Sequence, residues 1–379
     1  MSTKTPITIV GAGLAGYGVI RELRKLDSEV PITLITQDDG AFYSKPRLSS
    51  HLSSGRSLES LVSSTGEDMA QKNNFTLLKY NNLLSINAPT KQLSTQHGEQ
   101  AYGKLVLAMG AVPRQPSYQH NSKSIFSVNH LADYLRLVPR LTQRQTVVIY
   151  GGGLVACEFA NDLALAGHDV HLVTRSTSLL DRLVTSATSE LLAKALQIAG
   201  IHVRLGCDIQ QITETTQGLQ INFDQGSPVL AHIVLNAIGL IPHPSYHSLG
   251  LRTERGIVVN EYLQTNLPEV YAIGDGAQYP EGWLPFVMPI GTAAKTLAQN
   301  LLGQEAKLSF PPMPVAVKTP AFPIVIGPHS KPNLLHSVDI TDGGCAETWR
   351  DEQGRLRGFV LGGHRCADKA TFMKEWLLQ

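Results

Sequence analysis

Cysteine is scarce in this chain. Four cysteines occur among 379 residues, at positions 157, 207, 345 and 366. None of them forms a Cys-x-x-Cys pair, and their spacing matches no metal-ligand pattern. We therefore predict reduced, mostly buried thiols and no metal site.

The chain also lacks an excess of charge of either sign and any long apolar run. It has 32 Lys+Arg against 31 Asp+Glu, which argues against a nucleic-acid partner or an electrostatically bound membrane. No apolar stretch reaches the roughly 18–20 residues that span a bilayer. A strand pattern follows the N-terminus almost at once and leaves no room for a signal peptide. We expect a cytoplasmic protein that acts on small molecules, without membrane insertion.

The first strong motif is a glycine loop between a strand pattern at residues 6–10 and a helical pattern that runs to Leu26. Its residues are Gly11, Ala12, Gly13, Leu14, Ala15 and Gly16. The first glycine allows a tight turn, the second lets the backbone approach a pyrophosphate, and the third lets helix and strand pack. The helix N-terminus then faces the anion. This order predicts a dinucleotide site.

The strand pattern at residues 31–36 ends where such folds place an acidic residue against the adenosine ribose. Here that position is Thr36, followed by Gln37 and Asp38. We predict that Thr36 and Gln37 contact the adenosine, with Asp38 as the possible carboxylate.

The strand, loop and helix plan occurs a second time. A strand pattern at residues 145–150 leads into GGGLVA, in which Gly151, Gly153 and Ala156 take the three loop positions. A repeated nucleotide-binding unit predicts two dinucleotides, one acting on the other. At the end of the next strand, Arg175 stands where an acid would bind the ribose of NAD. An arginine there can accept the 2′-phosphate of NADP, or it is simply a solvated turn residue, so the choice between NADH and NADPH stays open.

The stretch TNLPEVYAIGD, residues 265–275, completes the first nucleotide site. A β-prone run stops at Gly274 and Asp275, and a carboxylate there can accept hydrogen bonds from sugar-like hydroxyls. The stretch resembles the second FAD motif of flavoproteins with two dinucleotide domains, whose aspartate holds the ribityl chain. Strand patterns at 104–110 and 233–239 bracket the insertion between the two halves.

These patterns predict an α/β protein with two Rossmann-like dinucleotide-binding domains and a small C-terminal α+β domain. We place the FAD-binding domain at residues 1–112 and 240–308. The NAD(P)H-binding domain, residues 113–239, is inserted in it, and the α+β domain covers residues 309–379. Strand patterns broken by prolines characterise that last part.

Two charged residues are candidates for tuning the flavin. The segment at residues 42–49 lacks the cysteine that disulfide reductases carry there and has Lys45 instead. A cation beside a flavin stabilises negative charge that develops on reduction; the alternative is an exposed loop lysine. Glu158, on the first turn of the second helix, is expected to face the nicotinamide and meet Lys45, or merely to complement the helix dipole.

Three further positions carry weaker signals. Backbone at Leu83 can pair with an adenine edge. Val287 precedes a helical pattern that we expect to start near Pro289, and it either touches the flavin ring or packs in the core. Lys318 reaches the flavin edge or is an exposed strand lysine.

Six motifs together resemble the rubredoxin–NAD reductases of bacterial electron-transfer chains, over nearly the whole chain. They are GAGLAG, YSKPRLS, GGGLVACEFAND, TNLPEVYAIGD, LPFVMPI and MPVAVKTP. The resemblance implies that hydride from NADH reaches FAD and that electrons leave singly to a small iron protein. It implies FAD contacts at Ala12–Ala15, Thr36, Gln37, Lys45, Leu83, Glu158, Asp275, Val287 and Lys318. The chain departs from the family at Met109, where threonine is usual, at Gly276, where cysteine is common, and at Arg175.

We therefore predict an FAD-dependent electron-transfer reductase that passes electrons from NADH to rubredoxin. Reduction of ferredoxin or flavorubredoxin is the nearest alternative, and a thiol peroxidase or disulfide reductase is a weaker one. A redox-dependent binding flavoprotein resembling apoptosis-inducing factor is the alternative of another class. Arg21, Arg24, Lys25 and Arg47 are candidates for docking an acidic carrier; the alternative is a solvated helix face.

Overall fold

The computed structural model describes residues 5–118, 122–141, 143–328 and 333–377. The chain forms two compact units, and each is described by itself. The first contains Met1–Ser44, Leu58–Val112 and Leu240–Phe310, and the second contains Lys45–Ser57, Pro113–Gly239 and Pro311–Gln379. The second unit holds the predicted NAD(P)H region together with the C-terminal part, so the three-domain division stays a prediction.

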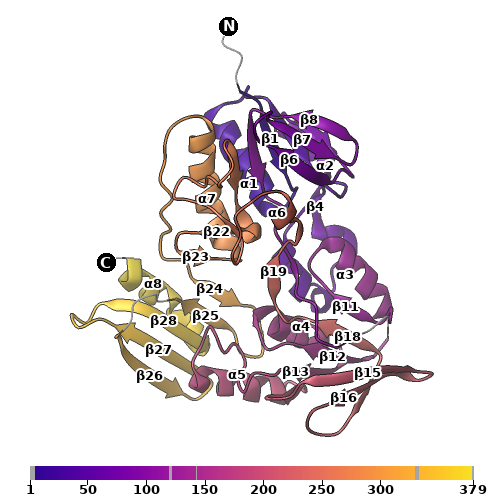
Figure 1. Ribbon diagram of the computed structural model, residues 1–379. Helices are drawn as coiled ribbons and strands as arrows, with labels where there is room; N and C mark the ends of the chain where they lie inside the picture. Colours follow the sequence, from indigo (N-terminus) through magenta and orange to yellow (C-terminus); the bar gives the residue numbers. More distant parts are fainter. Residues whose placement is uncertain (1–4, 119–121, 142, 329–332, 378–379) are drawn as a thin grey trace. The chain divides into compact units, whose positions relative to one another are not determined.

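A five-stranded parallel sheet forms the centre of the first unit (Figure 1). Its strands, in spatial order, are β21 (Val270–Ala272), β9 (Lys104–Leu107), β1 (Ile7–Val10), β2 (Ile32–Ile35) and β5 (Thr76–Leu78). The strands are short, almost entirely apolar and buried, as expected for a sheet covered on both faces. All carboxyl ends therefore meet at one edge, where the loops after β1 and β21 lie.

Two helices pack against each other beside this sheet, α1 (Leu14–Leu26) and α7 (Val287–Leu301). Their approach depends on a small residue, because a Cβ added to Gly18 would lie 3.3 Å from that of Ala294. The antiparallel meander of β6 (Leu83–Asn87), β7 (Gln92–Thr95) and β8 (Gly98–Ala101) completes the larger elements. The smaller ones are β3 (Phe42–Tyr43), η3 (Leu58–Leu61), β4 (Val62–Ser64), α2 (Gly66–Lys72), β10 (Ala111–Pro113), β19 (Leu240–Pro242), α6 (Ser245–Ser248), β20 (Ile257–Val258), η5 (Gly274–Gly276), β22 (Ala277–Tyr279) and β23 (Gly282–Trp283).

A second parallel sheet forms the centre of the second unit. Its order is β11 (Ile125–Ser127), β18 (Ile233–Asn236), β12 (Thr146–Tyr150), β13 (Asp169–Val173) and β14 (His202–Arg204). The helices of this part are α3 (Leu131–Leu137), η4 (Val138–Arg140), α4 (Leu154–Leu165) and α5 (Ser186–Ile198), and the inserted segment adds η1 (Lys45–Ser50) and η2 (Leu52–Ser54). An antiparallel meander, β15 (Ile209–Thr215), β16 (Gly218–Phe223) and β17 (Val229–Ala231), shares a buried apolar cluster with Val148 and Tyr150 of β12.

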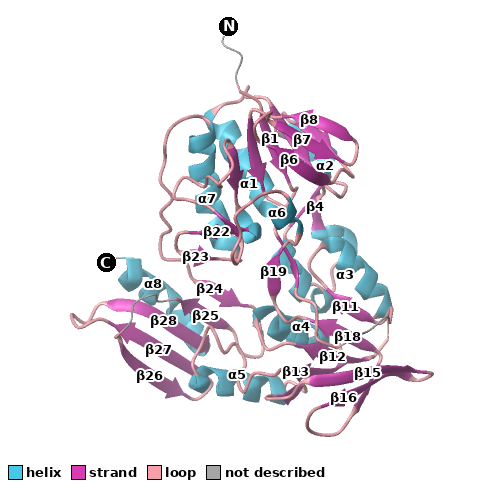
Figure 2. Cartoon of the chain, in the orientation of Figure 1, coloured by secondary structure: helices cyan, strands magenta, loops and turns pink. Residues whose placement is uncertain are grey.

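The C-terminal part of the second unit is an antiparallel sheet (Figure 2). Its order is β24 (Val315–Val317), β25 (Ile324–Gly327), β28 (Leu356–Gly363), β27 (Gly344–Arg350) and β26 (Leu335–Thr341), followed by η6 (His364–Asp368) and α8 (Lys369–Leu377). The α8 residue Trp376 packs edge-on against Phe359 of β28. The buried carboxylate of Glu347 on β27 accepts hydrogen bonds from Thr185 and Thr188, which joins this sheet to α5.

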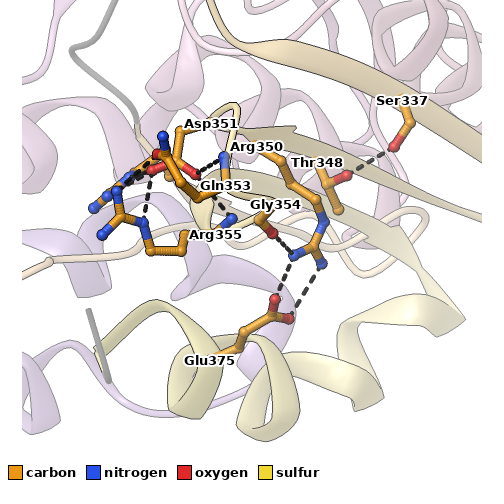
Figure 3. Close-up of polar contacts among 9 residues, drawn as sticks. Ser337, Thr348, Arg350, Asp351, Gln353, Gly354, Arg355 and Glu375 are labelled. Carbon is orange, nitrogen blue, oxygen red and sulfur yellow. Dashed lines mark hydrogen bonds and ion pairs between the residues drawn. The ribbon is translucent and has the colours of Figure 1, made fainter.

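Polar contacts fix the register of the hairpin between β27 and β28 (Figure 3). Asp351 accepts the backbone N–H groups of Gln353 and Arg355, at 3.1 and 3.0 Å. Desolvation acts to raise the pKa of Asp351, but hydrogen bonds from Arg357 and Arg355 outweigh it and lower this pKa to about 2. Arg350 reaches Glu375 of α8 from the same hairpin.

The predicted fold class is confirmed: each glycine loop follows a strand of a parallel sheet, β1 or β12, and an antiparallel α+β part ends the chain. Helix α7 begins at Val287, two residues before the predicted start near Pro289. Among the helices in the described ranges, none is both long and apolar enough to cross a bilayer.

Two glycines with the same backbone conformation test how tightly the first loop is packed. Gly11 has φ +114° and Gly98 has φ +118°, yet an added Cβ would lie 2.4 Å from the Ala108 carbonyl oxygen only in the first case. We expect Gly98→Ala to cost about 1–2 kcal/mol of unfolding free energy, the price of left-handed backbone for alanine. Gly11→Ala should cost about 1–3 kcal/mol more because the neighbouring strand must move. Urea unfolding followed by circular dichroism measures both, and equal losses would contradict the packing explanation.

Candidate active site

The predicted site residues are divided between the two units. The first unit holds Gly11, Ala12, Gly13, Leu14, Ala15, Gly16, Thr36, Gln37, Leu83, Asp275 and Val287. The second unit holds Lys45, Gly151, Gly153, Ala156, Glu158 and Lys318. Each group is therefore described within its own unit.

The first glycine loop leaves an open space at the N-terminus of α1. Gly13 is the N-cap residue, so no N-cap side chain accepts the amides of the first turn, and that turn has no acidic residue. A Cβ added to Gly13 would find no other described heavy atom within 4 Å, whereas one added to Gly16 would overlap the Gly11 carbonyl oxygen at 2.0 Å. The open space and the unpaired amides fit a pyrophosphate.

The Gly274–Asp275 turn lies beside this loop. A Cβ added to Gly274, which has φ +79°, would lie 2.8 Å from the Cβ of Ala15. The backbone of the turn is held by Tyr279, whose hydroxyl accepts the Gly274 N–H at 2.9 Å, and by Trp283, whose indole N–H donates to the Asp275 carbonyl at 2.8 Å. The fold thus brings together two motifs that are about 260 residues apart in the sequence, because both follow strands of one parallel sheet.

A turn at the end of β2 holds Thr36, Gln37 and Asp38, whose predicted role at the adenosine stays a prediction. Thr36 is buried, and its hydroxyl donates to the Asp38 carboxylate, which also accepts the Gly40 N–H at 3.0 Å. Asp38 therefore shapes the turn, while Gln37 is exposed and sterically open to a ligand. Leu83 begins β6, where it pairs with Thr95 of β7.

Val287 lies at the first turn of α7 and is 49% exposed, and its neighbour Met288 is 50% exposed. The alternative that these side chains are ordinary core residues is therefore wrong. Two exposed apolar side chains at a helix N-terminus are available for contact with a ring system.

The second glycine loop repeats the geometry of the first. Gly153 caps α4 with φ −83° and ψ −178°, close to the −81° and −174° of Gly13. An added Cβ at Gly153 would likewise meet no other described heavy atom within 4 Å, and Gly151 has φ +139°. Ala156 is fully buried under the loop. The second loop thus fits a second pyrophosphate.

Glu158 is a buried carboxylate with several donors. It is 2% exposed and accepts the Ser49 hydroxyl, the Lys318 backbone N–H at 2.9 Å and the Lys318 ammonium at 3.3 Å. Because α4 begins at Leu154, Glu158 lies beyond the first turn, so the helix dipole does not account for its position. Lys318 directly follows β24 and is exposed, as the alternative has it, but its ammonium also donates to the Pro46 carbonyl oxygen.

Lys45 lies in the same unit, and its ammonium donates to Asn129 Oδ1 at 2.9 Å. Lys45 begins η1 and is half-buried, so the alternative of an exposed loop lysine is wrong. The predicted pairing of Lys45 with Glu158 stays a prediction.

Two other polar residues of the CEFAND motif continue this arrangement. Asp162 accepts the N–H groups of Leu52 and Ser53, both at 3.0 Å. Asn161 Oδ1 accepts the Ala321 N–H at 3.0 Å. Glu158, Asn161 and Asp162 are three and four residues apart on α4, so they share one face of the helix. This face binds both the Lys45 segment and the Lys318 segment.

Ser49, Asn161 and Asp162 were not predicted as site residues. The motif CEFAND was recognised as specific, but its partners lie about 110 to 160 residues away, and helical spacing does not identify them. The signal available in the sequence was the spacing of Glu158 and Asp162, two acidic residues four positions apart in an otherwise mostly apolar helix.

The four cysteines are free, and three of them are buried. Burial is the main cause that raises the pKa of each thiol, to about 12 for Cys157. Thiols in this state are poor nucleophiles. The absence of a reactive thiol disfavours the disulfide-reductase alternative.

The basic residues proposed for docking have other partners. Arg24 donates to the carbonyl oxygens of Asn73 and Asn74, Lys25 pairs with Glu22 at 2.6 Å, and the Arg21 guanidinium lies over the Phe42 ring. Arg47 belongs to the other unit. The first three therefore stabilise the first unit. Arg175 is exposed after β13.

Two family models match this chain. Residues 5–289 match the family model described as pyridine nucleotide-disulphide oxidoreductase. The chain belongs to this family. Residues 307–376 match a second model, described as a rubredoxin binding C-terminal domain.

Relatives within the pyridine nucleotide-disulphide oxidoreductase family extend over nearly the full chain. The rubredoxin-NAD(+) reductase of Alcanivorax borkumensis is 36% identical over 98% of this chain and 98% of its own length. The nitric oxide reductase FlRd-NAD(+) reductase of Aeromonas salmonicida is 35% identical over 97% of this chain and 96% of its own. The resemblance drawn from the six motifs is confirmed.

Solved structures share the fold of this chain. The reductase chain of a covalent putidaredoxin reductase–putidaredoxin complex superposes with a TM-score of 0.89 at 22% identity, covering 99% of this chain and 93% of that chain. At this identity the likeness concerns the fold alone.

The carboxylate of Asp162 provides a test of how α4 holds the inserted segment. Burial is the main cause that raises the pKa of Asp162, although hydrogen bonds from Ser53 and Leu52 oppose it. Asp162→Asn keeps the shape but turns one acceptor into a donor, which should cost about 1–3 kcal/mol. Hydrogen exchange at the Leu52 and Ser53 amides should accelerate by at least about tenfold, equivalent to about 1.4 kcal/mol.

The matched control is Asp181→Asn, since Asp181 is exposed and accepts one hydroxyl, from Ser176 at 2.8 Å. Exchange at Leu52 and Ser53 should not change in this variant. Unchanged exchange in Asp162→Asn as well would show that other contacts hold the segment.

Proposed function

We propose that this chain is an FAD-dependent reductase that passes electrons from NADH to rubredoxin. The observation that carries the proposal is the pair of equivalent open glycine N-caps, Gly13 and Gly153, in a chain whose last part matches a rubredoxin binding domain. Two dinucleotide sites in one chain serve the transfer of electrons between two cofactors.

In this proposal the first unit binds FAD. Gly11 to Gly16 hold the pyrophosphate, Thr36 and Gln37 lie against the adenosine, and Leu83 pairs with the adenine edge. Asp275 accepts the ribityl hydroxyls, and Val287 packs against the ring. The open space at Gly13 and the proximity of Gly274 to Ala15 support these assignments.

Gly151, Gly153 and Ala156 bind NADH on the second unit. When bound, FAD accepts hydride from NADH and releases the electrons one at a time. The protein orients the rings and sets the local charge through Lys45, Glu158 and Lys318. Glu158 keeps the Lys318 ammonium within 3.3 Å while it accepts the backbone N–H of the same residue, so the cation is held in one place.

Arg175 leaves NADPH as a second possible donor, since it is exposed at the end of β13, where the ribose of the nucleotide lies in such folds. A cytoplasmic location is also proposed. The four free cysteines support it, because thiols persist in reducing compartments.

One other acceptor is favoured by a specific observation, because the Aeromonas salmonicida relative is named for a flavorubredoxin-type acceptor and is almost as similar as the rubredoxin reductase. If the chain were instead a redox-dependent binding flavoprotein, NADH would reduce its flavin slowly. The kinetic experiment separates these cases.

That experiment is anaerobic stopped-flow of the flavin-containing protein, first with NADH or NADPH and then with rubredoxin, flavorubredoxin or ferredoxin. We expect rapid bleaching by NADH, slower bleaching by NADPH, and rapid reoxidation by rubredoxin. Fast bleaching followed by reoxidation only with flavorubredoxin or ferredoxin would show that one of these proteins, and not rubredoxin, is the electron acceptor. Slow bleaching with a persistent long-wavelength band would overturn the reductase assignment.

The two open glycines allow the cofactor sites to be tested separately. Gly13→Ala should fold normally, since its Cβ enters open space, but it fills the place a pyrophosphate approaches. We expect the affinity for FAD to fall by at least about tenfold, or about 1.4 kcal/mol. Titration of the apoprotein with FAD, followed by flavin fluorescence, measures it.

Gly153→Ala is the reciprocal control. It should retain its flavin and raise the concentration of NADH that gives half-maximal bleaching by a similar factor. Loss of flavin from Gly153→Ala, or normal FAD affinity in Gly13→Ala, would contradict the assignment of the two loops.

A further inference from the structure

Three metal-ligating side chains gather at the amino ends of β13 and β14, away from the glycine loops. His171 and His202 are direct register partners on these two parallel strands. Asp169 precedes His171 by two residues, so both side chains lie on the same face of β13. A ligand atom from each of the three residues lies within 4.8 Å of the others.

The distances within this cluster suit a shared cation better than hydrogen bonds. The Nε2 atoms of His171 and His202 lie 3.7 and 3.4 Å from different oxygens of the Asp169 carboxylate. N–H···O hydrogen bonds are about 2.7–3.2 Å long. Metal bonds of about 2.0–2.2 Å arranged tetrahedrally separate their ligand atoms by about 3.3–3.6 Å. The two imidazole rings also stack, with centroids 4.5 Å apart.

The protein leaves His171 poorly satisfied by its own groups. Its side chain is 13% exposed, and the buried Nδ1 has no hydrogen-bond partner among the described residues. Nε2 is the ring atom that faces the Asp169 carboxylate, so it is the nitrogen that would bind a metal.

The carboxylate is held in place for such a role. The Thr146 hydroxyl donates to Asp169 Oδ2 at 3.2 Å from the adjacent strand β12. His202 is 61% exposed and Asp169 is 30% exposed, so an ion would reach the cluster from solvent and keep a water as a further ligand. Outer contacts of this kind orient metal ligands.

We propose that Asp169, His171 and His202 bind a divalent transition-metal ion, with zinc as the expected one. Two imidazoles and one carboxylate suit borderline ions such as zinc, nickel and copper, whereas calcium and magnesium prefer oxygen ligands. This site changes the sequence-based expectation of no metal, which rested on cysteine spacing alone.

The site is separate from the proposed nucleotide site of the same sheet. Gly151 follows the carboxyl end of β12, whereas Asp169 and His202 are the first residues of β13 and β14. Bound metal would cross-link two neighbouring strands where the chain enters them. We therefore expect an effect on stability and none on the bleaching of the flavin by NADH.

The test uses the untagged, flavin-containing full chain, treated with EDTA and desalted. Zinc chloride is titrated into it calorimetrically near neutral pH, and thermal unfolding is recorded with and without zinc. We expect one zinc ion per chain and a higher unfolding temperature with zinc. The affinity should fall by at least about tenfold in His202→Ala and in Asp169→Asn. His202 is exposed, so its replacement should leave folding and flavin content unchanged.

The matched control is His97→Ala, which removes an exposed histidine from the other unit and should bind zinc as the native chain does. Absence of stoichiometric binding to the native chain would overturn the proposal. Equally tight binding to His202→Ala would overturn it too, because the zinc would then be held elsewhere. Neither result depends on whether NADH reduces the flavin.

Discussion

The need to satisfy buried carboxylates determines much of the second unit. Glu158 and Asp162 lie on one face of α4, and both are almost fully buried. A buried carboxylate without donors is costly, so each must be surrounded by N–H and O–H groups. The donors come from the Lys45 segment and from Lys318, far from α4 in the sequence. Folding of α4 thus holds Lys318 and the segment that follows Lys45.

The two glycine loops differ from the buried carboxylates, because the partners that their amide groups need are not supplied by an N-cap side chain. Gly13 and Gly153 leave the first amides of α1 and α4 without a capping side chain, which lowers the stability of these helix ends in the free protein. A bound pyrophosphate supplies the missing acceptors. Any ligand that binds only the folded chain stabilises it, so the protein should depend on its dinucleotides for full stability. The buried carboxylates of α4 therefore hold distant chain segments in place, whereas the open glycines leave room for the proposed dinucleotides.

Local patterns predicted the strands and loops well, because the continuous apolar runs of β1, β9, β12 and β18 and the glycine spacing depend only on neighbouring residues. They did not reveal Ser49 or Asp162, whose contacts span more than 100 residues. They also did not reveal that Asp38, the possible ribose carboxylate, accepts hydrogen bonds from Thr36 and Gly40. Val287 was ambiguous because an apolar residue at a helix start looks the same whether it is buried or exposed.

The parallel sheet of the second unit explains how two different sites can coexist without interfering. All its strands point the same way, so every carboxyl end lies at one edge and every amino end at the other. Helix N-termini follow the carboxyl ends and favour anions, which suits a dinucleotide. Helix C-termini, the negative ends of the dipoles, precede the amino ends of β13 and β14, and there Asp169 lies beside His171 and His202. The proposed anion site and the proposed cation site thus occupy opposite edges of the sheet for the same topological reason.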